Sequence, residues 1–117
     1  MQNADEMGQY LRGKLDDMRA DHPLIGDVRG KGLLIGVELV KDRQTRQPAE
    51  TEAYRLAYRC FELGLILLAF GNVMEITPPL TITRSDADEA LDIFDRALAD
   101  IEAGRFDDSK LPAFLGH

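Results

Sequence analysis

Apolar residues recur at three- and four-residue steps in three segments, which is the spacing of one helix face. The pattern predicts helices at about 3–20, 49–63 and 84–103. His22 ends the first, because a residue that precedes proline avoids helical angles. Gly64 and Gly104 are the expected stops of the other two. Thr83 is the expected N-cap of the last helix, and Asp86 completes a capping box with it.

Short apolar segments between the helices have the two-residue period of strands. They lie at 33–40, 65–70 and 73–77. The first is apolar on both faces, which predicts a strand covered on both sides. The three glycines within 26–32 predict a turn, and the polar residues 41–47 predict a loop. The order of elements predicts an α+β domain, with three helices packed on a small antiparallel or mixed sheet of about three strands.

Composition favours one soluble globular domain over residues 1–117, with a tail at 105–117, because 44% of the residues are hydrophobic and 30% are charged. The net charge of −7 argues against binding to nucleic acid and against an electrostatic membrane patch. No apolar run has the length of a membrane-spanning helix. The single cysteine excludes an intrachain disulfide and is compatible with a cytoplasmic location.

Candidate catalytic and metal-binding side chains are few. The histidines, His22 and His117, have no partner at ligand spacing, so we expect no metal site. Cys60 lies on the apolar stripe of the second helix, where a buried, inert thiol is the simpler interpretation than a nucleophile. The glycines at 26–32 precede a strand, whereas a phosphate-binding loop lies between a strand and a helix, so we reject that function for them.

Glu75 is the most informative polar residue. It lies in the middle of a predicted strand, between Met74 and Ile76. A charged side chain at such a position must face solvent, a cleft or a partner. The exposed face of a sheet is the simpler interpretation from position alone.

Three segments, taken in order, resemble class III (ornithine/4-aminobutyrate-type) PLP-dependent aminotransferases. They read HPLIGDVRGKGLLIGVE at 22–38, CFELGLIL at 60–67 and GNVMEITPPLTIT at 71–83. The resemblance implies the C-terminal small domain of PLP-dependent transferase fold type I. This domain closes over a cofactor that is held mainly by a preceding large domain, which this chain lacks. Lys14, Lys31, Lys41 and Lys110 match neither the PLP lysine nor any other cofactor-binding position.

The resemblance also implies a function for the parent enzyme. It would move an amino group between an amine or amino acid and a 2-oxo acid, use pyridoxal 5'-phosphate, and form a homodimer in the cytoplasm. This chain would contain no catalytic or cofactor-binding residue, would bind no PLP by itself and would be inactive when isolated. Its partner would be the missing large domain of the same polypeptide.

Glu75 stands where many members of this family have an arginine that binds the substrate carboxylate. An acid at this position would repel such a carboxylate. Either the parent accepts an amine without that group, or another arginine supplies the contact, or Glu75 recognises a cation. We expect Glu75 to face the substrate cleft of the parent enzyme.

Two alternatives to an aminotransferase remain open. The same fold also serves PLP-dependent lyases and decarboxylases. A stand-alone ligand-binding or dimerisation module is the other alternative, because the caps, stops and apolar stripes suffice for independent folding. A large exposed apolar patch would favour a domain that packs on a large domain. A polar exterior with a pocket of its own would favour the module.

Overall fold

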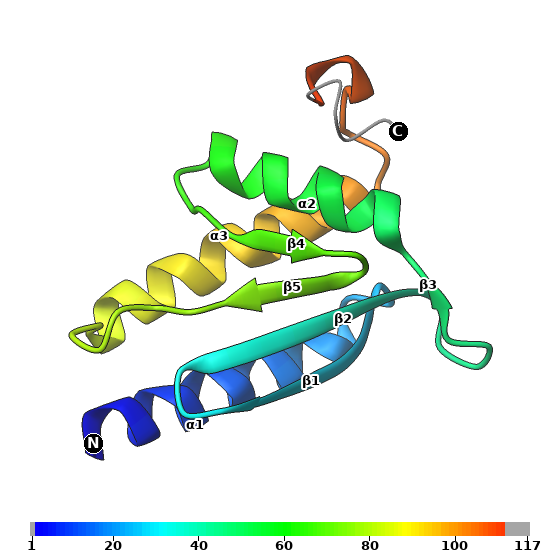
Figure 1. The fold of residues 1–117 in the computed structure, drawn as a ribbon. Helices are drawn as coiled ribbons and strands as arrows, with labels where there is room; N and C mark the ends of the chain where they lie inside the picture. Colours follow the sequence, from blue (N-terminus) through cyan, green and yellow to red (C-terminus); the bar gives the residue numbers. More distant parts are fainter. Residues whose placement is uncertain (1, 112–117) are drawn as a thin grey trace.

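The computed structural model describes residues 2–111, which form three helices, two short 3-10 turns and one antiparallel sheet (Figure 1). The helices are α1 (Gln2–Asp17), α2 (Glu50–Glu62) and α3 (Arg84–Glu102). The 3-10 turns are η1 (Met18–Ala20) and η2 (Asp108–Lys110). The strands are β1 (Ile25–Lys31), β2 (Leu34–Asp42), β3 (Gln47–Pro48), β4 (Leu68–Phe70) and β5 (Val73–Ile76). The α+β class is confirmed.

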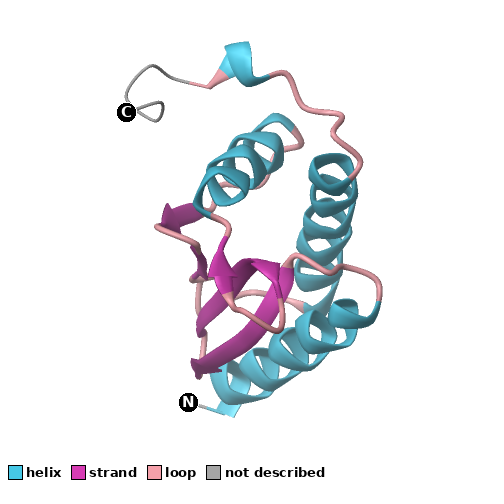
Figure 2. Ribbon diagram, turned by 90° about the vertical axis from the view of Figure 1, so that its right-hand side faces the viewer, coloured by secondary structure: helices cyan, strands magenta, loops and turns pink. Residues whose placement is uncertain are grey.

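The strands follow the order β1-β2-β5-β4, and β3 pairs with the far end of β2. Every pairing is antiparallel, and the sheet has five strands, so the prediction of about three was too low. Seen edge-on in Figure 2, the sheet lies at the left and the helices lie above it or to its right. No described helix covers the left face.

The hydrophobic core lies between the helices and the covered face of the sheet. Ile35, Val37 and Leu39 of β2 and Met74 of β5 are all fully buried there. The alternate residues of β2 turn to the other face, where Leu34 is 58% exposed. Val40, on the same face, is only 1% exposed. The prediction that this strand is covered on both sides was therefore wrong at Leu34 and right at Val40.

The glycine-rich segment at 26–32 forms strand β1, not the predicted turn. Only Gly32 has a positive φ, of 58°, and it makes the turn between β1 and β2. The other glycines allow close packing within the sheet. A Cβ on Gly26 would lie 2.8 Å from Val40 Cγ1, and one on Gly30 would overlap the Leu34 carbonyl oxygen.

The predicted helix boundaries agree with the structure within a few residues. Gly64 and Gly104 have φ values of 100° and 72°, which is the left-handed conformation of helix stops. Both halves of the capping box form: Asp86 N donates to Thr83 Oγ1 at 3.1 Å, and Thr83 N donates to Asp86 Oδ2 at 3.3 Å. The polar loop at 41–47 is shorter than predicted, because β2 extends into it and β3 folds back on β2.

Candidate functional site

A cleft of about 340 Å³ opens where β4 and β5 separate. The two strands pair from Leu68 opposite Glu75 to Phe70 opposite Val73. The residues before Leu68 and those after Ile76 are not paired across the cleft, so β4 is shorter than the predicted strand at 65–70. The lining combines these two diverging segments with α1, α3 and the turn before α3: Leu11, Leu65, Ile66, Leu67, Leu68, Glu75, Ile76, Thr77, Pro78, Pro79, Ile82, Asp86 and Ala90.

Glu75 lines this cleft from the uncovered face of the sheet. Its neighbour Met74 is fully buried in the core, so the alternation of β5 turns Glu75 to the opposite face. Leu68 and Gly36 lie beside it on the adjacent strands. The side chain is half-buried, and no hydrogen bond or ion pair joins its carboxylate to another described residue.

The charge of the cleft is entirely acidic among the described side chains. Glu75 and Asp86 are its charged residues, and the Asp86 carboxylate caps α3. PLP would need a lysine for its aldehyde and donors for its phosphate. Lys14 lies instead in a groove between α1 and α3, and the side chain of Lys110 lies outside the description. The described residues of this cleft therefore do not fit the cofactor.

An apolar patch surrounds this cleft on the uncovered face. Leu34, Leu68 and Phe70 alternate with core residues along their strands, and each is more than half exposed. Ile66, beside the cleft, is 77% exposed. The same face also carries the charged residues Arg29, Glu38 and Glu75. Exposed side chains as large as Leu34, Leu68 and Phe70 nevertheless favour packing of this face against another body.

Cys60 is fully buried in the core, as its place on the apolar stripe predicts. Burial raises the pKa of its thiol to about 12. Within residues 2–111 no group of three or more potential ligands could hold a metal ion. No helix in this part of the chain is both long and apolar enough to cross a membrane.

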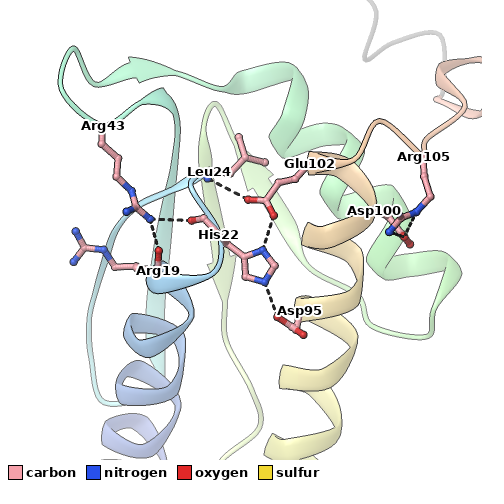
Figure 3. Close-up of polar contacts among 8 residues, drawn as sticks. All are labelled: Arg19, His22, Leu24, Arg43, Asp95, Asp100, Glu102 and Arg105. Carbon is pink, nitrogen blue, oxygen red and sulfur yellow. Dashed lines mark hydrogen bonds and ion pairs between the residues drawn. The ribbon is translucent and has the colours of Figure 1, made fainter.

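His22 has a role that the sequence did not predict. Its imidazole is buried between two carboxylates of α3, with Nδ1 2.6 Å from Glu102 Oε1 and Nε2 2.5 Å from Asp95 Oδ1 (Figure 3). Arg43 donates hydrogen bonds to the carbonyl oxygens of Arg19 and His22 beside it. The partners on α3 lie 73 and 80 residues away in the chain, so no local pattern signals the cluster.

The fold and the site together define a small α+β domain with helices on one face of its sheet and an acidic cleft where β4 and β5 separate. The chain belongs to the class-III aminotransferase family, whose model matches residues 1–98. The resemblance noted in the sequence is thereby confirmed.

The curated relatives include racemases and an aminotransferase. The chain is 49% identical over 112 residues to a leucine/methionine racemase of Thermococcus litoralis, which covers 95% of this chain and 25% of the relative. It is 43% identical over 101 residues to alanine–glyoxylate aminotransferase 2 homolog 2, mitochondrial, of Arabidopsis thaliana, which covers 84% of this chain and 21% of that protein. The chain thus spans about a quarter or less of the relatives' length.

Solved structures agree with this assignment. The omega transaminase from Pseudomonas jessenii in complex with PMP superimposes with a TM-score of 0.82 at 37% identity. The match covers 87% of this chain and 23% of the transaminase. The arrangement of helices and sheet is therefore that of one part of a larger transaminase.

Proposed function

We propose that this chain is the C-terminal small domain of a PLP-dependent class III aminotransferase whose large domain precedes it. The observation that carries the proposal is the uncovered sheet face, where Leu34, Leu68 and Phe70 are exposed, with the Glu75 cleft beside it. A preceding domain would bury this face, and the relatives are long enough to contain one. The parent is then a cytoplasmic homodimer that transfers an amino group to a 2-oxo acid.

The cofactor, when bound in the parent, acts as an electron sink for the bonds at the substrate α-carbon. It would be held by the large domain, because the described lysines of this chain lie away from the cleft. The role of this chain is to close one side of the substrate site. Ile66, Leu68 and Ile76 exclude water from it, and the isolated chain is inactive.

Glu75 gives this side of the substrate site, the wall that the chain supplies, its negative charge. A carboxylate in an apolar cleft repels a second carboxylate, since like charges interact strongly where water is scarce. The parent should therefore discriminate against substrates with an acidic side chain that reaches this wall. Substrates with a neutral or cationic side chain remain compatible with it.

Racemisation of neutral amino acids is a second candidate function. The relatives at 49% and 45% identity are a leucine/methionine racemase and an alanine/serine racemase, and an isoleucine 2-epimerase is 39% identical. The amino acids in the names of these relatives have neutral side chains, which agrees with an acidic wall. A chiral separation of the products from L-leucine and L-alanine, with and without a 2-oxo acid, distinguishes the two reactions.

The test of the Glu75 role uses the longer polypeptide that carries this chain. Glu75→Gln removes the charge and keeps the shape, and Glu89→Gln on the exposed surface of α3 is the matched control. We expect Glu75→Gln to raise kcat/KM for acidic amino acids relative to neutral ones by roughly tenfold, as one nearby like charge implies. The control should leave that ratio unchanged. If the Glu75→Gln variant leaves the kinetics of every substrate unchanged, Glu75 does not face the substrate.

A further inference from the structure

Two carboxylates of α3 meet a buried histidine, His22, of the segment between α1 and β1. Its side chain is only 6% exposed, whereas those of Asp95 and Glu102 are 56% and 20% exposed. The two carboxylates are seven residues apart on α3, so they lie on the same face and hold the ring between them (Figure 3). Both ring nitrogens are within hydrogen-bond distance of a carboxylate oxygen.

The number of protons in this cluster follows from the geometry. A neutral imidazole has one N–H, and an ionised carboxylate can only accept. Two hydrogen bonds from one ring to two carboxylates therefore require an imidazolium, or a neutral ring with one protonated acid. In either case the cluster contains one proton more than a neutral histidine with two carboxylates.

We propose that His22, Asp95 and Glu102 form a proton-dependent clamp, which fastens α3 to the segment between α1 and β1 only while this additional proton is bound. When the proton leaves, a ring nitrogen lone pair faces a carboxylate oxygen at 2.5–2.6 Å. Those two groups repel one another, and a partly buried contact that was attractive becomes unfavourable.

The clamp connects several elements. Glu102 Oε2 also accepts from Leu24 N at 3.3 Å. Arg43, from the turn after β2, donates to the carbonyl oxygens of Arg19, His22 and Ile25, the last two at 2.9 and 3.2 Å. Loss of the proton would therefore loosen α3, the end of η1 and the start of β1 together.

The surrounding charges favour retention of the proton. Burial by itself lowers the pKa of His22, but the hydrogen bonds and charges of Asp95 and Glu102 outweigh it, and the pKa is raised. On the side of α1 and η1, Asp17, Asp21 and the cation Lys14 line the same groove as Asp95, and the acids outnumber the lysine. Arg43 is turned toward the carbonyl oxygens and does not cancel the carboxylates at the ring.

The direction of the pH effect follows from this raised pKa. Unfolded histidine has a pKa of about 6.5, and the folded value lies above it. The contribution of the clamp to stability is complete below pH 6.5 and is lost as the pH rises through the folded pKa. Between the unfolded and folded pKa values of His22, the release of one proton on unfolding changes the folding equilibrium constant about tenfold per pH unit.

The test measures urea unfolding of the chain between pH 6 and 7.5, below the range in which Cys60 titrates when unfolded. Asp95→Asn removes one side of the clamp at an exposed position, where folding should survive. Asp92→Asn is the matched control, because it removes the same charge from the same groove, one turn away. We expect the wild type and Asp92→Asn to lose stability as the pH rises and Asp95→Asn to show a much flatter profile.

Two results would overturn the proposal. One is an identical pH profile for the wild type and Asp95→Asn. The other comes from NMR of the folded chain at pH 7, with ring nitrogens observed by ¹H–¹⁵N correlation and carboxyl groups by ¹³C shifts. A neutral His22 with both acids ionised contradicts the clamp, whereas the additional proton on any of the three groups supports it. His117→Asn identifies which ring signal belongs to His22.

Discussion

Substitution by alanine should change the stability of the domain in opposite directions at two glycines of α1, Gly8 and Gly13. Gly8 packs against the turn between β1 and β2, and a Cβ added to it would overlap the Gly32 carbonyl oxygen and lie 2.6 Å from the Gly32 carbon. Gly13 lies on the exposed face of the same helix, and a Cβ there would meet nothing within 4 Å. Both lie in the helix interior, where alanine is favoured over glycine by about 1 kcal/mol.

Gly13→Ala should therefore stabilise the domain by about 0.5–1 kcal/mol, because only the helix preference changes. Gly8→Ala gains the same preference but pushes α1 off the turn between β1 and β2. The overlap is with backbone atoms, which cannot rotate away, and overpacking of this kind costs about 1–3 kcal/mol. The helix would also pull Met7 and Leu11 out of the core. Less the gain in helix preference, we expect a net loss of about 0.5–2 kcal/mol for Gly8→Ala.

Urea unfolding, followed by the helical circular dichroism signal, measures both changes against the wild type. The m-value should stay constant, so that a shift of the midpoint reports stability. An equal gain for Gly8→Ala and Gly13→Ala would refute the close packing of α1 on the β1–β2 turn.

Two further predictions concern α3 and the buried thiol. Thr83→Ala should lower the free energy of unfolding by about 1 kcal/mol in the same urea assay, because it removes the acceptor for Asp86 N. Ser85→Ala, within the first turn of the helix, should change it little. With the pKa of Cys60 raised to about 12, roughly one thiol in ten thousand is ionised at pH 8, so labelling by a soluble thiol reagent should require unfolding. Rapid labelling in the absence of denaturant would contradict the burial of Cys60.

The helices of this domain are predictable because their signals are local. The apolar stripes, the cap at Thr83 and the stops at Gly64 and Gly104 all lie within a few residues of the structure they specify. Strand β1 escaped prediction because glycines normally indicate a turn. Gly26 and Gly30 are needed instead for close contact with Val40 and Leu34, which only the paired strand reveals.

The Glu75 cleft and the His22 cluster also differ in how far local sequence signals predict them. Glu75 could be singled out because a charged residue interrupts an apolar strand, and the alternation of β5 then fixes its face. The surface that it shares with Leu68 depends on pairing between strands and on their separation at the cleft. His22 could not be found, because its meaning comes from Asp95 and Glu102, which reach it only after α3 packs against the rest of the domain.

The most direct test of the proposed function is the mass and cofactor content of the polypeptide that carries this chain in its source cells. An antibody raised against the chain can purify it. We predict a protein several times heavier than 13.1 kDa that is yellow with bound PLP and bleaches with borohydride. A colourless protein of 13.1 kDa would contradict the assignment and would favour a stand-alone binding module.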